Sequence, residues 1–165
     1  MESSRMEIRP CEASDLDELQ EIRALAFGPV FRSFRDIVGP SIAEIALASA
    51  ETEQAGLLAD LCKPDSPQKV FVAVLETKTV GFVSISLDHT QKVGEIGLNA
   101  VHPDFAGRGV GTKLYEFALG EMKAAGMKVA TVGTGGDLSH APARRAYEKA
   151  GFGPSIPSLW MYRSL

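Results

Sequence analysis

The sequence has few of the residues that mark metalloproteins, disulfide-rich proteins and membrane proteins. Its 165 residues include only two cysteines and three histidines, and neither type is spaced like a set of metal ligands. Cys11 and Cys62 are therefore expected to be reduced thiols in a cytoplasmic protein without a metal site. The longest apolar runs, such as Val70 to Leu75, are much too short to cross a bilayer, and the charged first ten residues do not resemble a secretory signal.

Positive charge is also scarce. Seventeen Lys and Arg residues stand against 21 Asp and Glu residues, which gives a formal net charge of −4, and no dense basic run occurs. A nucleic-acid-binding protein needs a basic stripe that neutralises phosphates, so neither nucleic acid nor membrane is an expected partner. The remaining composition, 45% hydrophobic and 23% charged, is typical of a globular protein. The length suits a single domain over residues 1–165.

Apolar periodicity divides the chain into a helical first third and an alternating α/β remainder. A helix capped by Ser14 is expected to end at the irregular stretch Phe27 to Pro40, which Gly-Pro pairs bracket. The expected elements are a strand at 7–9, helices after 14 and at 41–61, strands at 70–75, 80–87 and 93–101, a helix at 109–125, a strand at 128–134, a helix at 141–150 and a last strand at 159–163. One parallel crossover among antiparallel hairpins indicates the class α/β (α+β), a mixed, mostly antiparallel sheet with helices on both faces.

Three glycines in five residues stand where a strand gives way to a helix. Gly107, Gly109 and Gly111 let the backbone turn tightly, and the following helix adds a partial positive charge at its N-terminus. Together they predict an anion site for a phosphate or pyrophosphate, with Arg108 as a cation at its rim. A simple turn is the alternative. The spacing does not match a P-loop, and the loop stands too late in the chain for a dinucleotide-binding fold.

Two segments resemble signature motifs of the GNAT acetyltransferase superfamily. Val101 to Leu114, which contains the glycine loop, is similar to that family's coenzyme A loop, Q/R-x-x-G-x-G/A. Ala143 to Phe152 is similar to its A-x-x-x-Y-x-x-x-G-F helix, with Tyr147 at the tyrosine position. The motifs lie one helix and one strand apart, and together they cover about residues 93 to 152. The resemblance implies a GNAT-like fold and acetyl-CoA as the co-substrate.

The resemblance also implies which residues bind the coenzyme. Backbone groups of the strand before the loop would hold the pantetheine arm as an added strand, and the loop amides would hold the pyrophosphate. The implied binding residues are Asn99, Ala100, Val101, Gly107, Arg108, Gly109, Val110, Gly111, Thr112, His140 and Arg144. Ala106 stands where the family usually has Gln or Arg, and His140 where many members have Asn. The effect of both departures on coenzyme contacts is open.

Transfer of an acyl group to an amine needs a base and benefits from an acid. Glu95 is the first candidate base, because it lies in the strand that leads into the loop and alternation puts it on the same face as Asn99. Asp137 and water are the alternatives, since the family has no fixed position for its base. Tyr147 is the candidate acid, because a phenol of pKa ~10 can protonate a thiolate whose thiol has a pKa of ~8.5.

These features predict an acyl-CoA-dependent N-acetyltransferase with Glu95 and Tyr147 as its catalytic residues. It would move an acetyl group from acetyl-CoA to a primary amine of a small molecule, directly and in a ternary complex. Acetylation of a peptide or protein amine is one alternative, and a non-catalytic acyl-CoA-binding sensor is another. The sequence leaves open the identity of the amine, the preferred acyl chain and whether the chain forms a homodimer.

Overall fold

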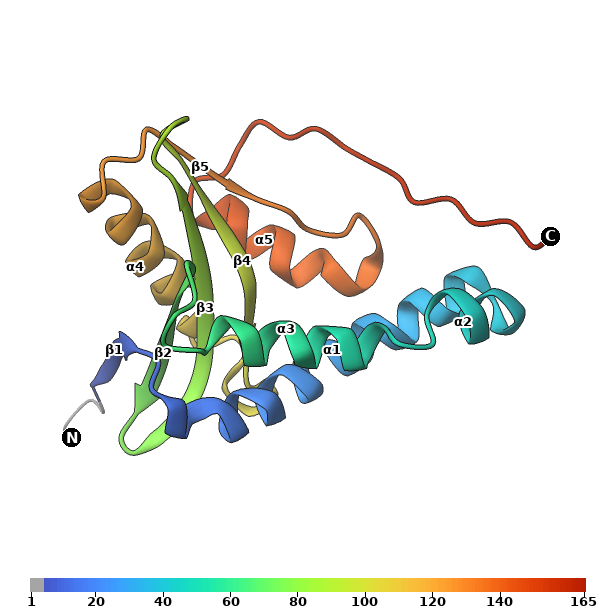
Figure 1. The fold of residues 1–165 in the computed structure, drawn as a ribbon, viewed down its shortest axis with the longest axis horizontal. Coiled ribbons are helices and arrows are strands. Elements are labelled where there is room, and N and C mark those ends of the chain that lie inside the picture. The colour runs from blue at the N-terminus through green and yellow to red at the C-terminus, as the bar shows by residue number, and fades with distance from the viewer. Residues whose placement is uncertain (1–4) are drawn as a thin grey trace.

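The computed structural model describes residues 5–165, which form a five-stranded sheet between helices (Figure 1). The strands lie in the order β1-β2-β3-β4-β5, and only the last neighbours, β4 and β5, are parallel. Their bounds are β1 Met6–Pro10, β2 Lys69–Leu75, β3 Lys78–Asp88, β4 Val93–Val101 and β5 Val129–Val132. The predicted mixed, mostly antiparallel sheet is confirmed, and a tight turn at Glu76 and Thr77 closes the expected hairpin.

Helices cover both faces of the sheet, as predicted. Their bounds are α1 Leu16–Val38, α2 Pro40–Ala46, α3 Ala50–Leu61, α4 Val110–Ala124 and α5 Ala141–Lys149, with short 3-10 segments at Ala13–Asp15, Pro103–Phe105 and Leu138–His140. One core joins α1 and α3 to the sheet around Leu19, Leu58 and Phe82, and the other joins α4 and α5 to it around Leu114 and Tyr147. Both faces of β3 are therefore buried, which explains its nearly continuous apolar sequence. Among residues 5–165, no helix combines the length and hydrophobicity that a membrane span requires.

The first helix is longer than the sequence pattern predicts. α1 continues through Pro29 to Val38, so the expected irregular stretch from Phe27 is wrong. Proline removes one backbone hydrogen bond, but Val30 and Phe31 beyond it are buried, and such packing supplies most of a helix's stability in a protein. The predicted helix at 41–61 divides at residues 47–49 into α2 and α3.

The start of α1 also differs from the prediction, because Asp15 stands at the cap and Ser14 does not. The Asp15 carboxylate accepts the backbone N–H of Glu12 at 2.7 Å and two guanidinium N–H groups of Arg9, each at 2.8 Å. This ion pair joins β1 to the start of the helix. The buried Asp15 carboxylate thus has three donors, but none of them is an N–H group of α1, so no side chain caps this helix as the serine hydroxyl was expected to do.

The segment after α5 forms no strand within the described residues, so the predicted strand at 159–163 is wrong. The chain leaves the fold near Phe152 and runs on as an extended tail (Figure 1). Apolar side chains along the tail are exposed, and Trp160 retains 87% of its accessible surface. Residue type favours a strand there, but a strand also needs a hydrogen-bonded neighbour, and no backbone group of residues 153–165 is bonded to the sheet.

Candidate active site

A β-bulge in β4 decides which side chains face which helices. Pairing with β3 steps from Val83↔Asn99 to Ile85↔Ile96, so β4 advances three residues while β3 advances two. Ile96 and Asn99 both face the helices α4 and α5, although alternation would separate them. Glu95 alternates with Ile96 and therefore faces the α1 side. The prediction that Glu95 shares a face with Asn99 is wrong, because an inserted residue reverses the alternation beyond it.

Ser84 of β3 stabilises this bulge. The Ser84 hydroxyl donates to the carbonyl of Leu98 at 2.8 Å. A Cβ on Gly97 would lie only 2.7 Å from the Ser84 hydroxyl oxygen. Any side chain at position 97 would push the hydroxyl away from the carbonyl. A larger residue at position 97 would therefore cost the bulge this hydrogen bond.

The strands β4 and β5 part halfway along β4. Their parallel pairing runs from Val93↔Val129 to Ile96↔Val132 and stops, whereas β4 continues to Val101 with β3 as its partner. Between residues 97 and 101 the β5-facing edge of β4 has no strand beside it in the described chain. The positions expected to hold the pantetheine arm, Asn99 to Val101, lie on this stretch. An extended ligand can add to such an edge as a further strand.

The glycine loop follows directly and leads into α4. Gly107 and Gly109 have φ values of +75° and +79°, in the left-handed region that glycine adopts without strain. Within residues 5–165, none of the backbone N–H groups from Gly107 to Thr112 donates to a protein acceptor. The helix N-terminus adds a partial positive charge to these free donors. Such an arrangement suits a pyrophosphate.

Two cationic side chains lie next to this loop, and only one of them, Arg108, belongs to the glycine motif. The Arg108 guanidinium carbon lies 5.2 Å from the centre of the Phe105 ring, and Lys78 Nζ lies 5.4 Å from the same centre. Lys78 comes from the start of β3, and no sequence signal connects it with the loop. Ala106 offers no polar side chain here. Arg108 and Lys78 are therefore the two cations that the structure brings together over Phe105, next to the glycine loop.

Tyr147 lies on α5 with 7% of its surface exposed. Its ring packs against Tyr115 of α4, with 4.9 Å between the ring centres. The phenolic oxygen of Tyr147 accepts a hydrogen bond from Asn99 Nδ2 at 3.0 Å, and Asn99 Oδ1 accepts one from the Tyr115 hydroxyl at 2.8 Å. The candidate acid therefore stands beside the unpaired stretch of β4. Tyr115 is not among the predicted site residues, because its place in the sequence of α4 does not distinguish it from a residue that only packs against the sheet.

A second polar cluster at the start of α5 contains Asp137, His140 and Arg144. The Asp137 carboxylate accepts hydrogen bonds from Ser33 of α1 at 2.9 Å and from Ser139, and it lies 2.7 Å from His140 Nδ1. Burial alone would raise the pKa of Asp137, but the hydrogen bonds from Ser139, His140 and Ser33 outweigh it and hold that pKa well below its usual range. A carboxylate of such low pKa is a weak base at neutral pH, which disfavours Asp137 as the general base.

His140 and Arg144 are also engaged by the protein. His140 stacks on Phe34 of α1 with 5.7 Å between the ring centres, besides its contact with Asp137. Arg144 donates to the carbonyls of Gly135 and Asp137 at 2.6 and 2.7 Å. Both residues thus fix the loop that precedes α5, close to the point where β4 and β5 part.

Glu95 differs from Asp137 in its surroundings. Its side chain is exposed on the α1 side of the sheet, and it makes no hydrogen bond or ion pair with the described part of the chain. Its carboxylate is therefore free to meet an incoming cation.

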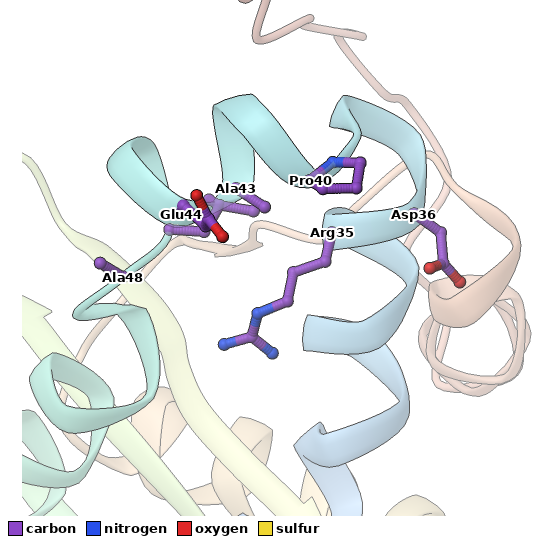
Figure 2. Close-up of a pocket in the computed structure, with 7 residues that line it drawn as sticks. Arg35, Asp36, Pro40, Ala43, Glu44 and Ala48 are labelled. Carbon is purple, nitrogen blue, oxygen red and sulfur yellow. The ribbon is translucent and has the colours of Figure 1, made fainter.

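A hollow of about 500 Å³ lies elsewhere, at the outer end of α1 (Figure 2). Figure 2 shows Arg35 extending from α1 into the space below α2, and its guanidinium pairs with Glu51 at 3.0 Å. The lining residues are Arg35, Asp36, Pro40, Ala43, Glu44, Leu47 and Ala48. None of the sequence-predicted site residues is among them, so this hollow is separate from the glycine loop and Tyr147.

Known proteins share this fold. The solved structures with the same fold include a GCN5-related N-acetyltransferase from Ralstonia eutropha JMP134, with 18% identity and a TM-score of 0.66 over 96% of this chain and 99% of that one. Another is the aminoglycoside N-acetyltransferase AAC(6')-Iy with a bisubstrate analogue of coenzyme A, with 16% identity and a TM-score of 0.65 over 98% and 100%. A third is the aminoglycoside acetyltransferase meta-AAC0020 from an uncultured soil metagenomic sample, in complex with sisomicin, with 18% identity and a TM-score of 0.58 over 97% and 96%.

Sequence comparison identifies the family directly. No curated protein matches the chain. The model of the acetyltransferase (GNAT) family, however, matches residues 33–152, which include the bulge, the glycine loop and the tyrosine helix. Because this match covers most of the chain, the protein belongs to the GNAT family of acetyltransferases.

Proposed function

We propose that this protein transfers an acetyl group from acetyl-CoA to a primary amine of a small molecule, in a ternary complex and without an acyl-enzyme. The observation that carries this proposal is the parting of β4 and β5 beside a loop of free N–H donors. The unpaired edge from Asn99 to Val101 suits the amide-rich pantetheine arm. The amides from Gly107 to Thr112, with Arg108 and Lys78, suit the pyrophosphate.

The two candidate catalytic residues lie on opposite faces of the sheet, Tyr147 beside the opening and Glu95 just before it, where β4 is still paired with β5. Glu95 faces the α1 side and would take a proton from the acceptor's ammonium group, directly or through a water molecule. The free amine then attacks the thioester carbonyl, and a backbone N–H near Val101 would stabilise the oxyanion. As the carbon–sulfur bond breaks, Tyr147 gives its proton to the departing sulfur. The second proton of the acceptor nitrogen passes to solvent, and Tyr147 regains a proton from solvent.

Two findings favour a small amine as the acceptor. Structures with the same fold include enzymes named for aminoglycosides, one of them in complex with sisomicin. Glu95 is an exposed carboxylate that pairs with no group of residues 5–165, and it would attract a cationic amine. His140 and Arg144 contribute by fixing the loop at the far side of the opening.

The proposal is tested by measuring thiol release from acetyl-CoA with a panel of aminoglycosides, polyamines and other primary amines, and with peptides that carry a free N-terminus. Turnover with at least one small amine is the expected result. Turnover with peptides alone would replace the small-molecule acceptor by a protein one. Tight binding of acetyl-CoA without turnover on any acceptor would make the protein an acyl-CoA sensor and overturn the proposal.

Replacement of Glu95 by glutamine is expected to remove the rise of kcat/KM with increasing pH. Glutamine keeps the size of the side chain but cannot take a proton, and loss of a general base typically lowers the rate by about 10²-fold or more. The measurement is the pH–rate profile with saturating acetyl-CoA. Glu116→Gln, an exposed position on α4, is the control and should keep the wild-type profile. A Glu95→Gln profile identical to wild type would assign the proton to bulk water.

A further inference from the structure

The bulge in β4 places one side chain, Asn99, between two tyrosines from different helices. Asn99 meets Tyr115 from α4 and Tyr147 from α5 only because the extra residue in β4 turns it to that face. In a regular strand it would point toward α1. The bulge therefore determines which side chain contacts the candidate acid, Tyr147, in addition to changing the pairing of β4 with β3.

The hydrogen bonds around Asn99 determine which atom of its amide faces which tyrosine. Asn99 Nδ2 lies 2.9 Å from the carbonyl oxygen of Gly97. A carbonyl can only accept, so the atom beside it must be the nitrogen of the amide. The same nitrogen lies 3.0 Å from the Tyr147 oxygen, and its second hydrogen is directed there. The amide oxygen is left to accept from Tyr115.

The direction of this chain of bonds has a consequence for each tyrosine. The hydroxyl hydrogen of Tyr115 is occupied by Asn99 Oδ1, and burial raises the pKa of Tyr115 far above its ordinary value, so this phenol keeps its proton. Tyr147 receives a hydrogen bond from Asn99 and does not need its own hydrogen for it. The Tyr147 oxygen also lies close enough to the Tyr115 hydroxyl to raise the pKa of Tyr115 further, but Tyr147 itself donates no hydrogen bond among residues 5–165, so its hydrogen is available to an external acceptor.

We propose that Asn99 is a positioning residue for acid catalysis: its side-chain N–H holds the Tyr147 oxygen and thereby directs the Tyr147 proton toward the leaving sulfur. This inference rests on the proposed function. The bond that breaks is Tyr147 O–H, and the bond that forms joins that hydrogen to the departing thiolate. The negative charge left on the phenolic oxygen is stabilised by the Asn99 N–H until solvent returns a proton. Tyr115 fixes the orientation of the Asn99 amide from the other end.

A double-mutant cycle on kcat tests this role. Asn99→Ala is expected to lower kcat roughly 10-fold with little change in the KM for acetyl-CoA, and Tyr147→Phe lowers kcat further. The double variant should be no slower than Tyr147→Phe alone, because without the phenol there is no proton to direct. Asn99→Asp should be at least as slow as Asn99→Ala, since a carboxylate keeps the shape but accepts the Tyr147 hydrogen. Effects of Asn99→Ala and Tyr147→Phe that multiply would overturn the proposal.

Val72→Ala supplies the structural control. It removes buried apolar surface from the core on the α1 side of the sheet, and it belongs neither to the bulge nor to the tyrosine cluster. Its effect on kcat, whatever the size, should multiply with that of Tyr147→Phe.

A readout without turnover separates this inference from the proposed function. In ¹⁵N-labelled protein, Tyr147→Phe should shift one of the two Asn99 side-chain amide protons and leave the other, which is bonded to Gly97, nearly unchanged. If neither proton shifts, the assigned direction of the bonds is wrong, even in an active enzyme. If one shifts but no acceptor is acetylated, the proposed function fails while the arrangement of Asn99 stands.

Discussion

Tyr147→Phe is expected to lower kcat by about 10²-fold and to leave coenzyme A affinity nearly unchanged, as loss of a general acid does. The phenol stands beside the unpaired stretch of β4, and its hydroxyl donates no hydrogen bond to any residue from 5 to 165. Phenylalanine keeps the ring packing against Tyr115, so the fold and the coenzyme loop should persist. Steady-state kinetics measure kcat, and titration calorimetry measures the Kd for coenzyme A.

The matched control for this substitution is Tyr162→Phe. Tyr162 lies in the C-terminal tail, outside the active-site region, and its loss of a hydroxyl should leave kcat at the wild-type value. A Tyr147→Phe enzyme as fast as wild type would remove Tyr147 from the mechanism. A variant with weak coenzyme binding would instead assign Tyr147 to the binding of acetyl-CoA.

Gly109→Val is expected to give the second largest effect, a loss of coenzyme affinity. Gly109 has a φ of +79°, where an L-residue costs roughly 1–2 kcal/mol and a β-branched one is least tolerated. A Cβ at this position would meet no atom within 4 Å, so the expected effect comes from backbone strain. As the backbone leaves this conformation, the N–H groups of the loop turn away from a common acceptor. Loss of even one charge-assisted hydrogen bond, worth about 1.5–3 kcal/mol, weakens binding about 10- to 100-fold.

Titration calorimetry with coenzyme A measures this effect, and Gly120→Ala is its control. Gly120 lies within α4 and has open space around its Cα, so alanine there should stabilise the helix by about 0.5–1 kcal/mol and leave coenzyme binding unchanged. Wild-type affinity in Gly109→Val would mean that the loop amides do not hold the pyrophosphate.

The sheet, its order of elements and the two family motifs could be predicted from the sequence because they depend on local patterns. Apolar alternation, turn residues and glycine spacing are local signals, and they located β2 to β4, α4 and α5 to within a few residues. The continuation of α1 through Pro29 was not predictable in the same way. It depends on the burial of Val30 and Phe31 against parts of the chain that are remote in sequence.

The chemical arrangement of the site was less accessible, because its contacts join distant residues. Ser33 bonds to Asp137 across 104 positions, and this bond helps to make Asp137 a weak base. Cys11 and Cys62, whose spacing suggests no relation, have their sulfur atoms 3.7 Å apart as free thiols. The bulge in β4 is a further case, because Gly97 alone does not reveal that Asn99 turns toward Tyr147.

The exposed tail determines what intrinsic fluorescence can report. Trp160 is the only tryptophan of the chain, and it lies outside both cores with 87% of its surface exposed. Its emission therefore follows the surroundings of the tail, and a blue shift on adding a ligand or raising the protein concentration would signal that the tail has docked. The buried Tyr115 and Tyr147 are instead the chromophores of the core. Near-ultraviolet circular dichroism of these tyrosines, rather than tryptophan emission, is the optical signal that follows unfolding of the active-site region.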